Sequence, residues 1–241
     1  MANPPKPTNQ QPQIPKNTDF QNATVSVTTP SSGSLQYALI LLHGLGDTNA
    51  NFTVLANRLN LPSTVVLALQ APKPMPFDLG GFHWGDDLVF SRDDQGSEEL
   101  SPDAEFGVAR AYIESIIRTL INNCGFSCLN IMLWGYGQGG MAALDYVCCC
   151  QSLRAVVSVG GWLPSWIKPR DILPLPRPTR ILLCGGITGS QLSNDRCRQI
   201  SEIFTDFSKV LIPSAGDLMP RNRDEMSLVL HFLLEIILNP T

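Results

Sequence analysis

Charged side chains are scarce in this chain of 241 residues: they make up 16% of it, and the formal net charge is −4. No stretch is basic enough to predict binding to nucleic acid or to an anionic membrane surface. The longest apolar stretches, such as 228–238, are shorter than the roughly 20 residues that a membrane-spanning helix needs. We therefore expect no nucleic-acid partner and no transmembrane segment, whereas 44% hydrophobic residues suffice for a sizeable core.

Residues 1–22 lack the apolar run of a secretory signal, and they contain no arginine. Proline, asparagine and glutamine dominate this segment, and such a composition cannot bury enough surface to offset the entropy of ordering. We expect a disordered tail over residues 1–22 and a single domain over residues 23–241.

Seven cysteines are present, an odd number that, without a secretory signal, predicts reduced thiols and a cytoplasmic protein. No histidine or second cysteine pair lies at the spacing of a zinc site, so we expect no metal and no cofactor. We interpret the run from Cys148 to Cys150 as three small residues packed at the end of a helix. Palmitoylation and metal binding are its alternatives.

Short β-branched runs alternate with helical stretches along the whole body of the chain. Such alternation predicts an α/β fold with a mainly parallel sheet of about seven strands and helices on both faces. The expected strands are 24–28, 37–42, 64–69, 129–134, 155–159, 180–184 and 209–212. The expected helices are 49–59, 101–123, 138–150, 195–206 and 223–238.

A glycine-rich turn from Gly135 to Gly140 (GYGQGG) joins a predicted strand to a predicted helix. In this context, G-x-S-x-G is the nucleophile elbow of α/β-hydrolases. Gly135 and Gly139 supply the outer glycines, but the central residue is Gly137 instead of serine. The same letters also satisfy the G-x-G-x-x-G spacing of dinucleotide sites, but they lie past the midpoint of the chain and no acid follows at the required distance.

Two further motifs accompany the elbow: LLHGLGD from Leu41 to Asp47, and Gln-Ala-Pro from Gln70 to Pro72. Together with the elbow, they resemble the phospholipase/carboxylesterase family, which includes the acyl-protein thioesterases. The resemblance covers about residues 37–238 and implies an α/β-hydrolase fold and no cofactor. A tryptophan and acid typical of the family's long loop are partly kept as Trp84 and Asp86.

The resemblance also implies three catalytic positions, and all three have changed. The serine is replaced by Gly137, the acid by Thr188 and the histidine by Asp217, and no histidine occurs between His83 and His231. A triad needs a nucleophile and a base that titrates near neutral pH. We therefore expect no intact catalytic residue.

The binding apparatus, in contrast, is predicted to persist. The backbone N–H groups of Leu45 and Gln138 occupy the positions of an oxyanion hole, and His43 shapes that loop. Residues 71–101 form a long irregular loop that should cover the elbow. The expected pocket candidates are His43, His83, Trp84 and Tyr136. The expected apolar wall is Phe77, Leu79, Phe82 and Trp84, with a small satellite core as the alternative, and His231 is expected to pack within the last helix.

The predicted function is that of an inactive carboxylesterase or acyl-thioesterase relative, which binds an acyl or carboxylate ligand or a protein partner. The alternative is an active carboxylic ester or thioester hydrolase with a non-standard catalytic set that recruits His83 or a cysteine.

Overall fold

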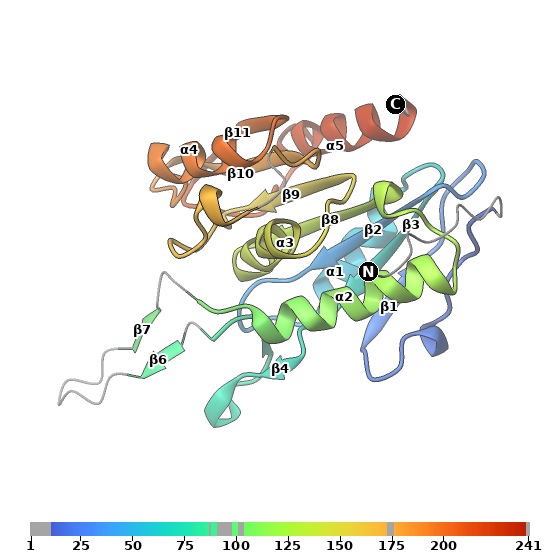
Figure 1. Ribbon diagram of the computed structural model, residues 1–241, viewed down its shortest axis with the longest axis horizontal. Coiled ribbons are helices and arrows are strands. Elements are labelled where there is room, and N and C mark those ends of the chain that lie inside the picture. Colours follow the sequence, from blue (N-terminus) through green and yellow to red (C-terminus); the bar gives the residue numbers. More distant parts are fainter. Residues whose placement is uncertain (1–10, 87, 91–97, 101–103, 173–175, 240–241) are drawn as a thin grey trace.

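The computed structural model describes residues 11–86, 88–90, 98–100, 104–172 and 176–239. Its centre is a seven-stranded sheet in the order β1-β3-β2-β8-β9-β10-β11 (Figure 1). β1 (Val25–Thr28) is an antiparallel edge strand beside β3 (Thr64–Leu69), and all other neighbours are parallel. The predicted mainly parallel sheet is therefore confirmed. The other strands are β2 (Tyr37–Leu42), β8 (Ile131–Tyr136), β9 (Ala155–Val159), β10 (Arg180–Thr188) and β11 (Phe207–Ala215).

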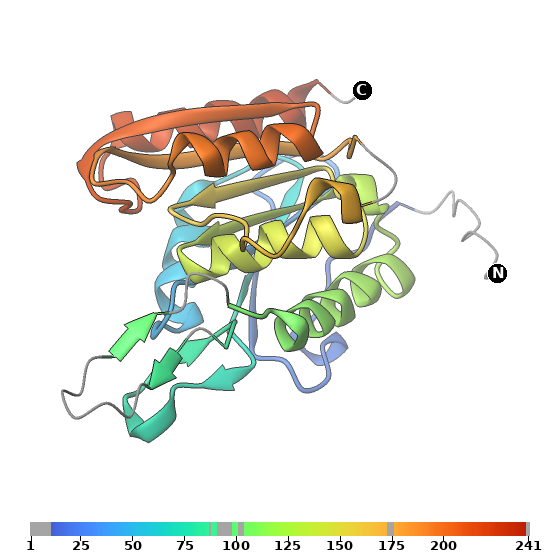
Figure 2. The ribbon, with the colours of Figure 1, turned by 60° about the vertical axis from the view of Figure 1, so that its left-hand side comes forward.

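Helices cover both faces of this sheet, as Figures 1 and 2 show. The inner strand β2 is buried on both sides, which explains its continuous apolar sequence. Successive side chains of a strand point to opposite faces, so alternate residues of β2 belong to two separate hydrophobic cores. Residues 38, 40 and 42 pack with α2 (Gly107–Asn122), α3 (Gln138–Cys149) and α4 (Asn194–Ile203), and residues 37, 39 and 41 pack with α1 (Asn49–Leu59) and α5 (Arg223–Leu238).

Most predicted elements match the structure, but two begin later than expected. The helix predicted from Ser101 begins at Gly107; residues 101–103 lie outside the described part, and the buried side chains of Ala104 and Phe106 enter the core before α2 starts. The strand predicted from residue 129 begins at Ile131, since residues 128–130 form a 3-10 turn that leaves Leu129 exposed. Tertiary burial decided the first boundary, and the 3-10 turn decided the second.

Two other strands are longer than predicted. β10 and β11 continue pairing to the ends of both strands, with one register irregularity between Gly186 and Thr188. Glycines disfavour strands by propensity, so Gly185 and Gly186 hid this extension in the sequence. The extension carries Thr188 to the carboxyl end of the sheet.

The segment that follows β3 differs most from expectation. η2 (Pro76–Asp78), a 3-10 turn, and the pair β6 (Leu88–Phe90) with β7 (Glu98–Leu100) project from the body (Figure 2). At the base, β5 (Phe82–His83) pairs with β4 (Lys73–Pro74), and Phe82 exchanges backbone hydrogen bonds with Gly46 and Asp47 at 3.0 and 2.9 Å. This anchoring directs the described tip outward, so the predicted cover over the elbow is not formed by these parts.

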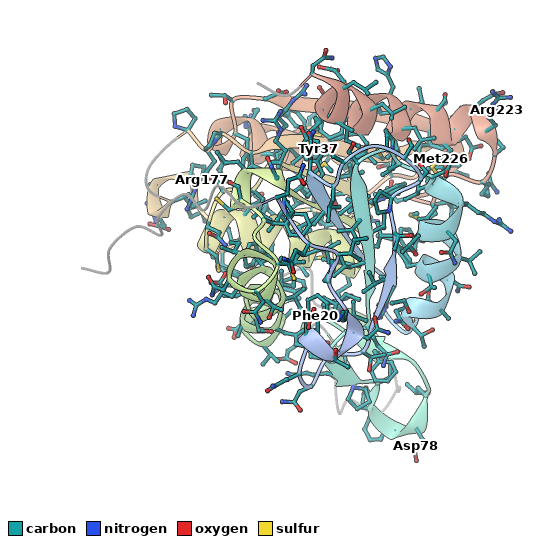
Figure 3. The ribbon with its side chains drawn as sticks, turned by 90° about the vertical axis from the view of Figure 1, so that its right-hand side faces the viewer. Phe20, Tyr37, Asp78, Arg177, Arg223 and Met226 are labelled. Atoms are coloured by element: carbon teal, nitrogen blue, oxygen red, sulfur yellow. The ribbon has the colours of Figure 1, made fainter. Side chains whose placement is uncertain are left out.

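The described part of the amino-terminal segment lies against the body. Phe20 (labelled in Figure 3) follows a 3-10 turn, η1 (Asn17–Asp19), and is buried in the same hydrophobic core as the inner face of α2. The Gln13 N–H group donates to the Cys124 carbonyl at 2.8 Å. Residues 1–10 of the predicted tail lie outside the described part, and a domain boundary at residue 22 stays a prediction. Within the described residues, no helix is long and apolar enough to cross a membrane.

Candidate functional site

The turn between β8 and α3 has the geometry of a nucleophile elbow. Gly137 precedes the first residue of α3 with φ +51° and ψ −118°, a conformation that L side chains rarely adopt. The outer glycines are sterically required: a Cβ on Gly135 would lie 2.2 Å from the Gly139 carbonyl oxygen. A Cβ on Gly139 would lie 2.4 Å from the His43 carbonyl oxygen. The sequence therefore keeps the glycines on which this turn depends.

The centre of the elbow, in contrast, is sterically open. A Cβ built on Gly137 would meet no heavy atom within 4 Å. A side chain here would project into that space, at the tip of the strand-to-helix turn. The position therefore has room for a nucleophile but offers no hydroxyl or thiol.

Asp217, expected at the position of the base, is held by backbone amides on the neighbouring loop. One carboxylate oxygen accepts a hydrogen bond from the Gly186 N–H group at 3.0 Å, and the other accepts one from Gln191 at 2.7 Å. Its Cβ lies against Gly160, where any added Cβ would approach it to 2.6 Å. Asp217 thus joins the loops that follow β9, β10 and β11. Its carboxylate serves as an acceptor that fixes these loops.

Thr188, expected at the position of the acid, is the exposed last residue of β10. Its carbonyl oxygen accepts a hydrogen bond at 2.7 Å from the N–H group of Gly216, the residue immediately before Asp217. β9 lies between β8 and β10 in the sheet, and Gly161 follows it. A Cβ on Gly161 would lie 2.7 Å from the Gly137 carbonyl oxygen. The ends of β8, β9, β10 and β11 therefore bring the elbow and the two changed positions to one edge of the sheet, as parallel strands require.

His43 is a buried structural residue that uses both ring nitrogens. Its Nδ1 lies 2.7 Å from the Gly44 carbonyl oxygen, and its Nε2 accepts the Ala71 N–H group at 3.0 Å. These partners require the proton on Nδ1, and desolvation by burial lowers the pKa of His43 below its ordinary value. The imidazole therefore ties the loop after β2 to the loop after β3. His43 is completely buried, so it does not line an open pocket, although it was predicted as a pocket residue.

The pocket candidates Trp84 and His83 are also buried, and Trp84 was expected in the apolar wall as well. Trp84 is 1% exposed and donates its indole N–H group to the His43 carbonyl at 2.8 Å. His83 is 9% exposed, and its Nδ1 lies 2.8 Å from the Gly85 carbonyl oxygen. Phe77 and Leu79 instead are 75% and 62% exposed on the projecting turn. Of the four expected wall residues, Trp84 and the half-buried Phe82 belong with the main core, so no common wall forms.

The Gln138 side chain holds the long loop against the elbow, a role that no sequence pattern suggested. Its Oε1 accepts the Trp84 N–H group at 2.6 Å, and its Nε2 donates to the Gly85 carbonyl at 3.3 Å. The partners are more than 50 residues apart in sequence, so no local spacing could reveal them. Gln138 is thus both the first residue of α3 and the contact point for residues 84 and 85.

The predicted oxyanion loop lies beside the elbow. Tyr136 is half-buried, and its ring lies 2.9 Å from the Cβ position of Gly44, the residue before Leu45. Phe82 fixes the same loop by accepting the Gly46 N–H group. The joint action of the Leu45 and Gln138 N–H groups as an oxyanion hole stays a prediction.

Two minor predictions can be compared with the structure. His231 is exposed on α5, so the expectation that it packs within the helix was wrong; the buried stripe of α5 passes through its neighbours Val229, Phe232 and Leu233. The cysteine run lies at the end of α3, where Cys148 is buried and Cys149 exposed. All seven cysteines are free thiols.

The fold and the elbow together define a protein of the α/β-hydrolase class. The sequence profile of the phospholipase/carboxylesterase family matches residues 23–232, and the chain belongs to this family. A curated relative, an uncharacterized hydrolase of Schizosaccharomyces pombe, is 36% identical over 134 residues, which make up 52% of this chain and 53% of the relative. The chain spans about half the length of the curated relatives that it matches.

Solved structures of esterases and thioesterases share the fold. Acyl-protein thioesterase 2 of Zea mays superposes with a TM-score of 0.62 at 21% identity, covering 88% of this chain and 97% of that one. A carboxylesterase of Bacillus cereus gives a TM-score of 0.68 at 14% identity, covering 92% and 99%. At these identities, the likeness concerns the fold alone.

Proposed function

We propose that this protein is a pseudohydrolase, which binds an acyl or carboxylate ligand or a protein partner without hydrolysing an ester. The observation that carries the proposal is Gly137, which has the backbone of an elbow centre but no side chain. Serine hydrolases need an oxygen nucleophile at this point, because it forms the covalent intermediate. At Gly137 that route is closed.

The surrounding groups also lack a base. Both oxygens of Asp217 accept backbone hydrogen bonds, and a carboxylate is a poor acceptor for a hydroxyl proton at neutral pH. Both ring nitrogens of His43 are engaged within the core. Activation of a water molecule in place of the serine therefore has little support.

Recruitment of a cysteine is disfavoured by burial. Desolvation raises the pKa of the buried Cys184 to about 12 and that of the buried Cys124 to about 11. The thiolate is the reactive form, so thiols of this kind are mostly inert at neutral pH. Their free state is compatible with the cytoplasmic location that we include in the proposal.

Ligand binding is supported by the features that remain around the elbow. The open space above Gly137 adjoins the amino end of α3, where aligned backbone dipoles favour a negative charge. A carboxylate or the carbonyl oxygen of an acyl ester suits such a position. The family relationship makes an acyl chain the natural remainder of the ligand.

Hydrolysis and binding should be measured on the same purified protein. The substrates are p-nitrophenyl esters and an acyl thioester of several chain lengths, and binding is measured by displacement of a fluorescent fatty acid. Gly137→Trp is the control, because its side chain would fill the open space above the elbow. Reaction with a fluorophosphonate probe reports any activated nucleophile independently of substrate choice.

We expect no fluorophosphonate labelling, no turnover above Gly137→Trp, and chain-length-dependent displacement that Gly137→Trp abolishes. An oxyanion hole alone can accelerate hydrolysis by about 10³ over water, so only larger rates are informative. Turnover well above that level, abolished by Gly137→Trp, would overturn the proposal. If acyl chains of no length displace the fluorescent fatty acid, the hypothesis of an acyl ligand is excluded and only that of a protein partner remains.

A further inference from the structure

A groove of about 380 Å³ separates α1 from α5 on the face of the sheet opposite α3. Its floor is apolar and comes from both helices. Val54 is 49% exposed at its edge, whereas Phe52, Ala56 and Leu59 of the same helix are buried in the core. The apolar lining consists of Val54, Leu55 and Leu59 from α1 and Met226 and Leu230 from α5.

Three arginines line the same groove: Arg58, Arg221 and Arg223. All three are exposed, and no acidic residue shares the lining. Figure 3 shows Arg223 pointing outward from the start of α5 and Met226 lying between α5 and α1. The groove therefore combines an apolar floor with a rim of positive charge on a protein whose formal net charge is −4.

These arginines differ from the others in the described part of the chain. Arg110, Arg118, Arg170, Arg180 and Arg198 form ion pairs, and Arg177 donates to a backbone carbonyl. In contrast, within the described residues the guanidinium groups of Arg58, Arg221 and Arg223 form no hydrogen bond, ion pair or ring contact. The arginines of the described residues for which the structure gives no partner thus line one groove.

Two acids lie close to these arginines in sequence, and neither pairs with their guanidinium groups. Asp224, adjacent to Arg223, is exposed, forms no ion pair within the described residues and is not among the residues that line the groove. Glu225 is buried, and its carboxylate accepts hydrogen bonds from the Arg221 N–H group and the Asn222 side chain, both at 2.8 Å. It closes the first turn of α5 and is not among the residues that line the groove. The three positive charges therefore face whatever enters the groove.

We propose that this groove binds an acidic peptide segment of a partner protein, with an apolar side chain in the groove and Asp or Glu residues on either side of it. Apolar anchors between two helices are a common mode of peptide recognition, and arginine pairs well with carboxylates. The positive rim attracts acidic partners, whereas the rest of the protein carries a net negative charge and repels them. Acidic segments are therefore directed to this groove.

Other anionic occupants fit these features less well. Nucleic acid requires an extended basic surface, and a chain of net charge −4 with three grouped arginines does not offer one. An anionic membrane presents a flat surface, whereas the apolar residues here line a hollow between two helices. The inference does not depend on the elbow, which lies at the carboxyl edge of the sheet.

Selection from a random peptide library tests this inference without assuming a partner. The bait is the full chain, and the counter-selection bait is the triple variant Arg58→Gln, Arg221→Gln and Arg223→Gln. We expect enriched peptides to share an apolar residue flanked by Asp or Glu. Synthetic versions should bind the wild-type chain in fluorescence anisotropy, and added salt should weaken the binding.

The triple variant should lower the affinity by roughly ten- to a hundredfold, as expected for the loss of three exposed ion pairs. Replacement of the peptide acids by Gln or Asn should have a similar effect. Val54→Asp tests the apolar floor separately and should also weaken binding. Arg170→Gln is the matched control, since this exposed arginine lies outside the groove and should leave the affinity unchanged.

All these substitutions change exposed side chains, so the melting temperatures should stay close to that of the wild type. The inference is overturned if no peptides are enriched, if the enriched peptides are not acidic, or if they bind the triple variant equally well. It is also overturned if the chain binds phosphatidylserine vesicles through the same arginines but none of the selected peptides.

Discussion

A serine at position 137 would have room for its side chain but an unfavourable backbone. Gly137 has φ +51°, and a non-glycine residue in such a region costs about 1–3 kcal/mol. No atom within 4 Å opposes the added Cβ, so strain is the only cost we expect. Gly137→Ser should therefore lower the melting temperature by about 2 to 12 °C. An unchanged or raised melting temperature would contradict the assignment of strain at this position.

The matched control for that substitution is Gly107→Ser. Gly107 is the first residue of α2, it has no positive φ, and its Cβ position also meets no atom within 4 Å. The same serine there should leave stability unchanged or slightly raised, since serine is favoured over glycine in a helix. A comparable loss at both positions would mean that added side-chain bulk, and not the backbone of the elbow, causes the effect.

His43 gives the protein a pH dependence with a definite sign. Burial lowers its pKa in the folded state, so between that value and the ordinary value near 6.5 the unfolded chain binds more protons. Stability is therefore fully present above about pH 6.5 and decreases as the pH falls, by up to about 1.4 kcal/mol per pH unit. Denaturant unfolding between pH 5 and pH 7.5 measures this slope, which His43→Gln should reduce.

A surface substitution controls for the change of histidine to glutamine itself. His231→Gln on α5 replaces an exposed side chain and should leave the stability at pH 7.5 close to that of the wild type. If His43→Gln keeps the wild-type slope between pH 5 and pH 7.5, groups other than His43 govern acid sensitivity in that range.

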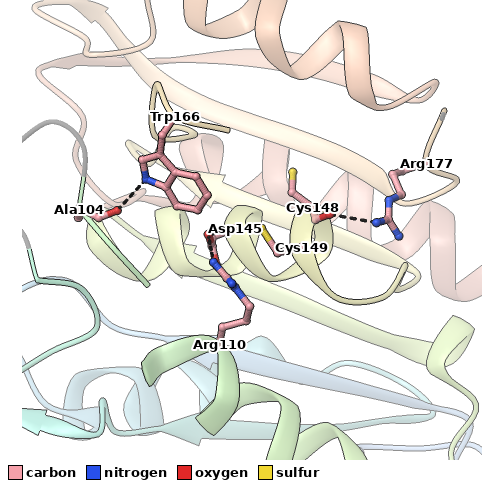
Figure 4. A network of polar contacts seen from close by, with 7 residues as sticks. All are labelled: Ala104, Arg110, Asp145, Cys148, Cys149, Trp166 and Arg177. Carbon is pink, nitrogen blue, oxygen red and sulfur yellow. Dashed lines mark hydrogen bonds and ion pairs between the residues drawn. The ribbon is translucent and has the colours of Figure 1, made fainter. Parts of the chain in front are cut away.

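At the scale of elements, an ion pair between the partly exposed Arg110 and a buried carboxylate joins α2 to α3. The Arg110 guanidinium donates to both oxygens of Asp145 at 2.8 and 2.9 Å (Figure 4), and Asp145 is completely buried. Burial raises the pKa of Asp145 even though Arg110 opposes this shift. Arg110→Leu would leave the carboxylate buried without a partner and should cost about 3–5 kcal/mol at pH 7.5. The cost should shrink toward pH 5, where a buried carboxyl more readily takes up a proton.

Two further variants isolate the pair. Arg110→Leu combined with Asp145→Leu removes both charges and should recover most of the lost stability. Arg198→Leu breaks the exposed pair with Asp195 on α4 and should cost less than about 1 kcal/mol. If Arg110→Leu proves as mild as Arg198→Leu in chemical denaturation, α2 and α3 are held by their apolar contacts and not by this pair.

The sequence predicted best those elements whose signal is local and whose burial is uniform. β2, β3 and β9 are buried and largely apolar strands of the sheet, and their bounds matched to the residue. The start of α2 depended on Phe106, whose burial against Gly85 joins segments separated by about 20 residues. The propensity of Ser101 and Pro102 to begin a helix gave no information about that contact. Tertiary packing therefore overrode this propensity.

The same distinction holds for the site at the scale of the whole molecule. The elbow was predictable because its strand, glycines and helix are consecutive, and strand order then brought Thr188 and Asp217 to the same edge. The position of Trp84 was not, because the hydrogen bonds that hold it in the core involve His43 and Gln138 from distant segments. Aromatic residues in a long loop suggested a wall for a ligand. Trp84 is instead buried in the core, where its large apolar surface stabilises the fold.

Rebuilding all three changed positions tests whether the whole carboxyl edge still has a hydrolase arrangement. The triple variant Gly137→Ser, Thr188→Asp and Asp217→His restores the nucleophile, acid and base that the family resemblance implies. It also removes the acceptor for the Gly186 and Gln191 N–H groups and adds strain at residue 137. These changes together should cost roughly 2–6 kcal/mol, a large part of the 5–15 kcal/mol typical of a domain.

We expect the triple variant to react with a fluorophosphonate at low temperature and to melt well below the wild type. Gly137→Ser alone should not react, since a serine without a base is a weak nucleophile. Circular dichroism identifies the temperature range in which the triple variant is folded. Absence of labelling within that range would mean that Thr188 or Asp217 does not occupy the position assigned to it. Labelling of Gly137→Ser alone would instead reveal an unrecognised base near the elbow and weaken the case for a pseudohydrolase.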